Sequence, residues 1–198
     1  MSPKAFTQKE KEFVRNKLLE AAKHYLTTTG IRKTSVEELS RYAGISKGAF
    51  YLFYKSKELL FLDALEVEQR AIHETIIREI SRQPSKRVAF ISVLSKMYKD
   101  FVTKPWLVAL STDEYEVLLR KIPQERVDSH IALDDASTRR LLNALAHDSD
   151  SDPQLLSALL RLLFMGILHR KEIGPYADDA FEYLLQAIAA RLFPEDQT

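Results

Sequence analysis

The 198-residue sequence contains no cysteine and only five glycines. Without cysteine the chain can form neither a disulfide framework nor a thiolate metal site. The few glycines leave little room for a phosphate-cradling loop. The five histidines are scattered and lack the spacing of metal ligands. We therefore expect no catalytic activity, no bound metal and no cofactor.

Long apolar runs are also missing. The most apolar stretch, residues 155–168, is interrupted by Ser157 and Arg161 and is too short to span a bilayer. The first residues lack the apolar core of a signal peptide. These features predict a cytoplasmic protein with no membrane partner.

The pattern that remains is helical throughout. No proline occurs between Pro3 and Pro84, and apolar residues recur at spacings of three and four. We predict an all-α fold in which two short helices flank the turn at residues 43–45. The longer predicted helices cover residues 7–28, 57–82, 85–103, 105–121, 134–147, 153–171 and 176–193, with loops at 122–133 and 148–152.

Residues 34–60 hold the most informative pattern. Ser35 and Glu38 are spaced as a capping box at the start of a helix, and Gly44 suits the tight turn that follows. Ser46 then caps a very short helix whose first residues, 47–49, are basic or small. A helix that places its N-terminus against base edges needs such residues, because bulk would hold it out of the groove. The segment is typical of a helix-turn-helix.

Charge is divided unevenly along the chain. The net charge is +1, but residues 1–60 carry +6 and the remaining 138 residues carry −5. A basic N-terminal part would neutralise DNA phosphates. An ordinary solvated surface explains the same charge, and charge alone leaves both interpretations open.

Residues 18–60 resemble the N-terminal domain of TetR-family transcriptional regulators. The motifs that carry this resemblance, in unbroken order, are Leu18-Leu19, Ala21-Ala22, Tyr25-Leu26, Gly30, Thr34-Ser35-Val36, Ala43-Gly44-Ile45-Ser46-Lys47-Gly48, Phe50-Tyr51, Ser56-Lys57-Glu58 and Leu59-Leu60. The chain departs from the family at two positions. Phe53 stands where His or Tyr is usual, and Tyr54 stands where Phe is usual, so the Tyr54 hydroxyl needs solvent or a partner.

The resemblance implies a helix-turn-helix DNA-binding domain over residues 1–55 and a ligand-binding and dimerisation domain over residues 56–198. It also implies a function: a homodimer binds a palindromic double-stranded DNA operator and, most often in this family, represses transcription. A small-molecule effector of unknown identity would release the repressor from the operator.

On this basis we predict nine DNA-binding residues: Lys47, Gly48, Ala49 and Tyr51, supported by Thr34, Ser35, Ser46, Lys55 and Lys57. Lys47 is expected to contact bases, and Gly48 and Ala49 to allow close approach. Tyr51, Lys55 and Lys57 are expected to contact phosphates. The hydroxyls of Ser35 and Ser46 would, in an alternative interpretation, do no more than cap helices.

The C-terminal segments 153–171 and 176–193 are apolar on more than one side. Such helices are buried on both sides, which suggests a four-helix dimer interface as in the family; the alternative is a central helix of a monomer. For an apolar effector we predict contacts with Trp106, Phe164 and His169, although residues of these types are more often ordinary core. Two other classes of protein remain open, an all-α enzyme with an accessory DNA-binding domain and a helical scaffold for protein partners.

Overall fold

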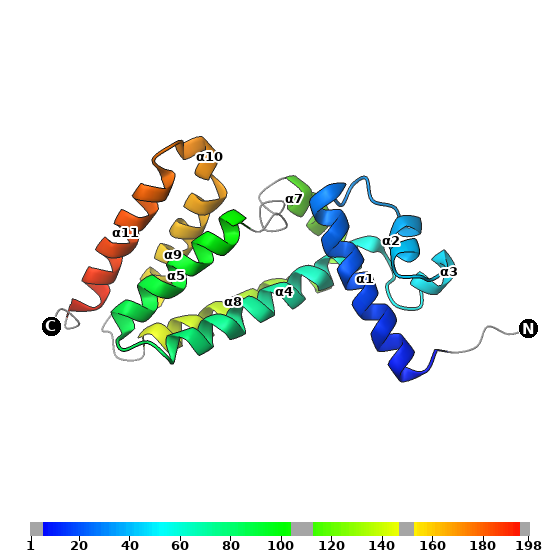
Figure 1. The fold of residues 1–198 in the computed structure, drawn as a ribbon, viewed down its shortest axis with the longest axis horizontal. Helices are drawn as coiled ribbons and strands as arrows, with labels where there is room; N and C mark the ends of the chain where they lie inside the picture. The colour runs from blue at the N-terminus through cyan, green and yellow to red at the C-terminus, as the bar shows by residue number, and fades with distance from the viewer. Residues whose placement is uncertain (1–5, 104–112, 147–152, 195–198) are drawn as a thin grey trace, which may run out of the picture. The chain divides into compact units, whose positions relative to one another are not determined.

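In the computed structural model, the described residues are 6–103, 113–146 and 153–194, and the regular elements among them are helices. The predicted all-α fold is confirmed. In chain order the helices are α1 (Gln8–Thr28), α2 (Val36–Tyr42), α3 (Lys47–Phe50), α4 (Lys57–Ile80), α5 (Lys86–Thr103), α7 (Asp113–Arg120), α8 (Gln124–Ala146), α9 (Pro153–Leu168), α10 (Arg170–Ile173) and α11 (Ala177–Leu192) (Figure 1).

The described residues form two compact units. The N-terminal unit contains residues 6–69 and 113–127, and the C-terminal unit contains residues 70–103, 128–146 and 153–194. The segment that holds α7 and the start of α8 therefore belongs to the same unit as the first three helices, although it follows them by some way along the chain.

The N-terminal unit is built on helix α1. This helix starts at a capping box in which Thr7 and Glu10 exchange hydrogen bonds. Its buried residues recur at the predicted spacing, and they are Val14, Leu18, Ala21, Ala22 and Leu26. Leu39 of α2 and Phe50 of α3 are also fully buried. Because each buried leucine or phenylalanine stabilises the fold by about 1.5–3 kcal/mol, these residues hold the two short helices in place.

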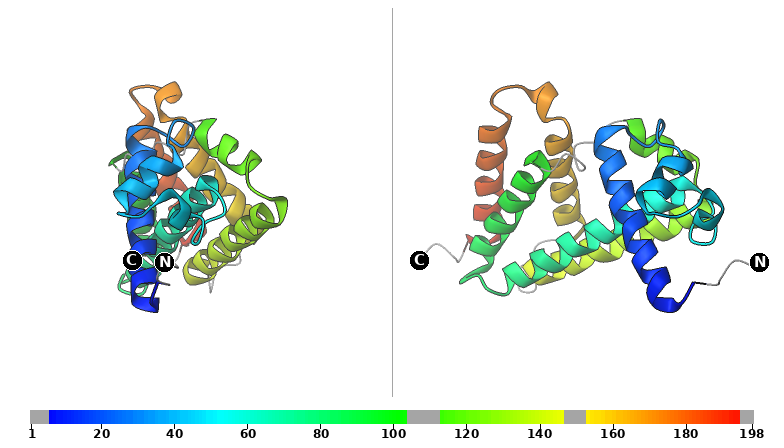
Figure 2. Two further views of the ribbon diagram at one scale, coloured as in Figure 1. Left: turned by 90° about the vertical axis from the view of Figure 1, so that its right-hand side faces the viewer. Right: turned by 45° about the vertical axis from the view of Figure 1, so that its right-hand side comes forward.

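Helices α5, α9 and α11 pack side by side in the C-terminal unit (Figures 1 and 2). Their shared core contains Ile76, Ala89, Phe90, Val93, Leu94, Leu141, Leu163, Ile167, Phe181, Leu185, Ala189 and Phe193. Aromatic rings join the helices at two points. The Phe90 and Phe193 centroids are 5.7 Å apart, and Tyr98 stacks on Phe181 with centroids 4.2 Å apart.

One predicted loop is wrong. Residues 122–133 were expected to be irregular, but α8 already starts at Gln124. The carbonyl of Pro123 accepts from the N–H groups of Arg126 and Val127, at 2.9 and 3.2 Å, which begins the helix. Val127 and His130 of α8 are both buried. Residues 105–112 and the predicted loop at 148–152 lie outside the described residues.

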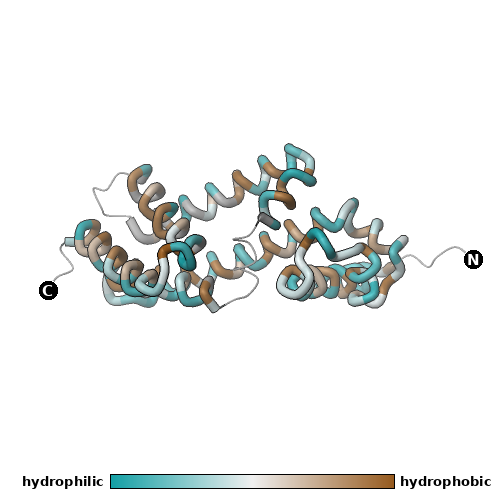
Figure 3. The backbone as a smooth tube through the Cα atoms, turned by 90° about the horizontal axis from the view of Figure 1, so that it is seen from above, coloured by the Kyte–Doolittle hydropathy of each residue, from teal (hydrophilic) through white to brown (hydrophobic). Residues whose placement is uncertain are grey.

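Hydropathy varies along the helices as packing requires. Figure 3 shows hydrophobic and hydrophilic residues alternating along the backbone, as expected for helices with one buried face. Among residues 6–103, 113–146 and 153–194, no helix is both long and apolar enough to cross a membrane.

Candidate DNA-binding site

Helix α2 begins with a reciprocal cap. The Ser35 hydroxyl oxygen accepts from the Glu38 N–H at 3.2 Å, and the Glu38 carboxylate accepts from the Ser35 N–H at 2.7 Å and from its hydroxyl at 2.8 Å. The predicted capping box is confirmed. The two hydrogen bonds to the Glu38 carboxylate lower the pKa of Glu38 below its ordinary value, and the bond from the Ser35 N–H has the larger effect. The capping box at the start of α2 is therefore complete with these two residues.

The turn between α2 and α3 depends on Gly44. Its φ is +71°, a conformation that side-chain-bearing residues rarely adopt. Space is not the reason for glycine here, because an added Cβ would meet no atom within 4 Å. The N–H of the next residue, Ile45, donates to the Ser40 carbonyl at 3.0 Å and closes the turn. The backbone conformation at Gly44 thus sets the angle between the two helices.

Helix α3 presents a small and basic N-terminus. The Ser46 hydroxyl oxygen accepts from the Ala49 N–H at 3.2 Å, and Phe50 anchors the helix in the core with no exposed surface. Lys47 and Gly48 are exposed. An added Cβ at Gly48 would meet only the Ser46 Oγ, at 3.9 Å. Packing within the chain therefore does not require glycine at position 48. The absence of a side chain there instead allows another molecule to come close to the backbone of α3.

The residues that follow α3 place further side chains on the surface. Tyr51 is 50% exposed and Leu52 is 74% exposed. The Tyr51 ring meets the buried Phe50 edge-on, with centroids 5.5 Å apart. Lys55 is exposed and has no ion-pair partner among the described residues. Tyr51 and Lys55 therefore remain accessible to phosphates.

The two departures from the family pattern have separate consequences. Tyr54 is buried, and its hydroxyl donates to Asp63 at 2.6 Å, so it has the partner that its position requires. Burial raises the pKa of Tyr54 above its ordinary value, and the hydrogen bond to Asp63 adds a smaller effect in the same direction. Arg15 of α1 donates to the same carboxylate at 2.8 Å. Phe53 instead packs edge-on against Phe6, with centroids 5.6 Å apart, and thereby holds the chain just before α1.

Lys57 and Thr34 point into the N-terminal unit. The Lys57 ammonium donates to the carbonyls of Ile31 at 2.7 Å, Arg32 at 3.2 Å and Thr34 at 2.6 Å. Its partial burial lowers the pKa of Lys57. The Thr34 side chain is 1% exposed and donates to the Gly30 carbonyl at 2.6 Å. Both residues thus hold the loop between α1 and α2, which positions α2 from its first residue.

Replacing Lys57 with methionine is expected to reduce stability without removing a phosphate contact. Three carbonyls lose a charged donor, which we expect to cost about 1.5–3 kcal/mol in the free energy of unfolding, measured by urea denaturation. The salt dependence of DNA binding should stay unchanged. The control Lys55→Met should behave in the opposite way, with unchanged stability and a salt slope reduced by about one. A reduced slope in Lys57→Met would contradict this role.

The ammonium group of Lys47 forms an ion pair with a residue of α2. Its partner is the carboxylate of Glu37, which lies in the first turn of α2. The side chains are 54% and 51% exposed, so the pair is on the surface of the N-terminal unit. This contact raises the pKa of Lys47 and lowers the pKa of Glu37, and both therefore stay charged at neutral pH.

Comparison with known proteins agrees with this geometry. Residues 18–64 match the family model described as bacterial regulatory proteins of the tetR family. The chain is also 29% identical over 131 residues to the HTH-type transcriptional regulator YuxN of Bacillus subtilis. This alignment covers 62% of the chain and 44% of YuxN, less than half of that relative's length.

Residues 18–64 form the N-terminal domain of the tetR family of bacterial regulatory proteins.

Solved structures of TetR-family proteins share the fold. A TetR-family transcriptional regulator from Mesorhizobium loti has a TM-score of 0.69 at 16% identity, covering 96% of this chain and 98% of the other. The regulator FadR from Bacillus subtilis, solved in complex with stearoyl-CoA, has a TM-score of 0.64 at 14% identity, covering 88% of this chain and 97% of the other. At these identities the likeness concerns the fold alone.

Of the three residues predicted to bind an effector, only His169 has a described side chain. Trp106 lies outside the described residues. Phe164 belongs to α9, and only its backbone is described. His169 is exposed between α9 and α10, with its Nδ1 atom 3.9 Å from the Glu172 carboxylate. The contacts of these three residues with an effector therefore remain predictions.

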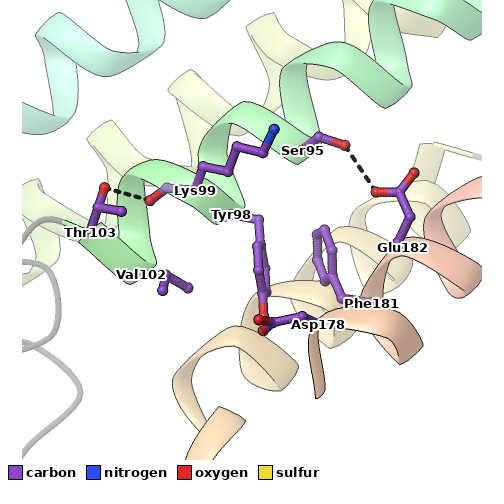
Figure 4. A pocket seen from close by; sticks show the side chains of 8 residues that line it. All are labelled: Ser95, Tyr98, Lys99, Val102, Thr103, Asp178, Phe181 and Glu182. Atoms are coloured by element: carbon purple, nitrogen blue, oxygen red, sulfur yellow. Dashed lines mark hydrogen bonds between the residues drawn. The ribbon is translucent and has the colours of Figure 1, made fainter. Parts of the chain in front are cut away.

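A hollow of about 300 Å³ lies between α5 and α11 (Figure 4). Tyr98, Lys99, Phe181 and Glu182 are among its lining residues. Beside it, Arg170 donates to Asp178 at 2.6 and 2.9 Å, and the Tyr98 hydroxyl also donates to Asp178. Hydrogen bonds from the Arg170 guanidinium and, to a smaller extent, from the Tyr98 hydroxyl lower the pKa of Asp178 to about 2. The described residues contain no group of three or more histidine or acidic side chains that could hold a metal ion.

Sequence reasoning missed two residues at the site. Glu37 was overlooked because the neighbouring Glu38 accounts for the capping box, and an acidic first turn is common in helices. Leu52 was not considered because an apolar residue beside Phe53 suggests core.

Proposed function

We propose that this TetR-family transcriptional regulator binds a palindromic DNA operator as a homodimer and represses transcription until a small-molecule effector releases it. The observation that carries the proposal is the N-terminus of α3, where Lys47 and Gly48 are exposed while Phe50 of the same helix is buried. A rigidly anchored helix with a small and basic start suits insertion into the major groove. The regulator would act in the cytoplasm, where its DNA target lies.

The proposed contacts divide into base and phosphate contacts. Lys47 would donate to base edges, and Gly48 and Ala49 would allow the backbone to approach them. Tyr51 and Lys55 would contact phosphates and fix the register of the protein on DNA. The excess charge of +6 on residues 1–60 supports this binding through phosphate neutralisation.

The remaining members of the predicted set would act indirectly. Ser35 and Ser46 cap α2 and α3. Thr34 and Lys57 hold the loop that precedes α2. We therefore limit the proposed surface of direct contact to Lys47, Gly48, Ala49, Tyr51 and Lys55, and treat the other four as residues that position it.

A second copy of the chain is the proposed partner of the C-terminal helices. Large apolar side chains are exposed on α9, α10, α11 and the residue before α11, which is unfavourable for an isolated chain in water. They are Leu155, Leu162, Met165, Ile173, Tyr176, Tyr183 and Leu184. A two-fold dimer would cover this face and would present two α3 helices to half-sites about 34–36 Å apart. In this proposal residues 1–55 bind DNA and residues 56–198 bind the effector and the partner.

Replacing Leu162 with glutamate tests the dimer. Leu162 is 68% exposed, so the chain should fold normally, but a charge at the interface should convert the dimer to a monomer. Sedimentation equilibrium would measure the mass, and operator affinity should fall with it. The control Leu133→Glu changes a leucine of α8 that is 52% exposed, and it should remain a dimer. A dimeric Leu162→Glu variant would count against this interface.

An effector is expected to act by population shift. One state of the dimer would hold the two α3 helices at operator spacing, and the effector would bind better to a state with another spacing. The complex of FadR with stearoyl-CoA supports a small apolar or amphiphilic ligand for this fold. Trp106, Phe164 and His169 remain the proposed contacts.

Binding to DNA from just upstream of the protein's own gene tests the proposal. Fluorescence anisotropy should give tighter binding to this DNA than to a scrambled duplex, with two chains bound per site. An enzyme with an accessory DNA-binding domain would require a specific turnover reaction. A helical scaffold would show no salt-sensitive preference between the two DNAs.

A further inference from the structure

Glu37 is not part of the capping box that begins α2. The start of α2 is already capped by Ser35 and Glu38. An ion pair as exposed as that between Glu37 and Lys47 stabilises a fold little, because solvent screens it. Its place is nevertheless specific, since it joins the first turn of α2 to the first residue of the recognition helix α3.

A carboxylate at this place affects DNA binding in two ways. It repels the phosphates of any duplex and so weakens non-specific binding. In the major groove, however, a glutamate can accept a hydrogen bond from the N4 amino group of cytosine, while lysine donates to O6 or N7 of guanine. The guanine O6 and the cytosine amino group are neighbours on the edge of one base pair. An ammonium and a carboxylate that touch each other therefore match the two halves of a C·G pair.

We infer that Glu37 is a specificity-determining residue that acts with Lys47 to read one C·G base pair in each half-site. Lys47 donates to the guanine, and Glu37 accepts from the cytosine. At T·A and G·C pairs Glu37 meets an acceptor where C·G presents the cytosine amino group, and it therefore repels the duplex. This inference rests on the proposed function, because it requires that α3 enters the major groove of an operator.

The variant Glu37→Gln tests this inference against the preferred sequence selected from random DNA. Each base pair of one half-site is changed in turn, and a scrambled duplex is included. The wild type should lose about 10-fold or more in affinity when one particular C·G pair becomes T·A. Glu37→Gln should lose that discrimination while binding the scrambled duplex more tightly than the wild type does.

The control is Glu20→Gln, which removes one negative charge from α1, where Glu20 pairs with Lys17. It should keep the discrimination at the C·G pair. A double-mutant cycle with Lys47→Gln should show that the effects of the two changes on the preferred duplex are not additive. Circular dichroism would verify that all variants are folded.

Two results would overturn the inference. One is Glu37→Gln retaining the full discrimination at every base pair. The other is equal gains by Glu37→Gln and Glu20→Gln on all duplexes, which would reduce Glu37 to one surface charge among others. A wild type with no preference for any sequence would instead overturn the proposed function, and this inference with it.

Discussion

Replacing Arg126 with methionine is expected to destabilise the N-terminal unit by about 3 kcal/mol. The guanidinium donates to both carboxylate oxygens of Glu66, at 2.8 and 2.5 Å, and the Glu66 side chain is 6% exposed. Removing Arg126 leaves this carboxylate buried without its guanidinium. The expected loss in unfolding free energy is at the lower end of the range for buried ion pairs because the Arg126 side chain itself is 32% exposed. Urea unfolding followed by circular dichroism would measure the loss.

Another arginine–glutamate pair provides a matched control. Arg120 of α7 and Glu116 lie 3.1 Å apart, but their side chains are 77% and 72% exposed. Arg120→Met should change the unfolding free energy by no more than about 0.5 kcal/mol, because exposed pairs contribute little. The double variant Arg126→Met, Glu66→Met should recover much of the loss, since no buried charge remains. Equal small effects at Arg126 and Arg120 would contradict this account.

The Arg126 pair belongs to a larger set of contacts from α7 and α8 within the N-terminal unit. Glu114 accepts from the N–H groups of Ile31 at 2.7 Å and Arg32 at 3.1 Å. Lys121 lies 3.7 Å from the Glu58 carboxylate. The loop that positions α2 is thus bound by Glu114 through its N–H groups and by Lys57 through its carbonyls.

Replacing Lys47 with alanine is expected to remove most of the sequence preference. A lysine that contacts guanine contributes about 1–3 kcal/mol of discrimination, so affinity for the preferred duplex should fall by about 10- to 100-fold. Affinity for a scrambled duplex should fall much less, because only one of several positive charges is lost. Anisotropy titrations of both duplexes at one salt concentration would measure the ratio.

Lys55→Ala is the control for Lys47. Its ammonium is exposed and proposed to contact a phosphate, so both duplexes should lose affinity to a similar extent. The ratio between preferred and scrambled DNA should therefore be kept in Lys55→Ala and lost in Lys47→Ala. Equal losses on both duplexes in Lys47→Ala would refute a base-reading role.

Local patterns in the sequence were sufficient to predict most helices and both caps of the helix-turn-helix. Capping at Ser35 and the conformation of Gly44 depend on residues a few positions apart, which sequence reasoning can see. The start of α8 was missed because its first turns are mostly polar, and only Val127 and His130 show the buried face. Polar surface and loop look alike in a single sequence.

Roles that depend on contacts between distant residues could not be predicted. The motif that contains Lys57 does not reveal that its ammonium reaches carbonyls 23 to 26 residues away. Likewise, Glu37 and Lys47 are ten residues apart, and only the angle of the turn at Gly44 brings them together. The family resemblance placed a boundary at residue 56, and this division remains a prediction.

Selection of bound sequences from a pool of random duplex DNA would test the central claim most directly. The account predicts an inverted repeat whose half-sites are centred about 34–36 Å apart, with one C·G pair required in each half. Binding of the recovered duplex should weaken steeply as salt is raised. Recovery of no common sequence by the folded wild-type protein would contradict the claim that α3 reads DNA.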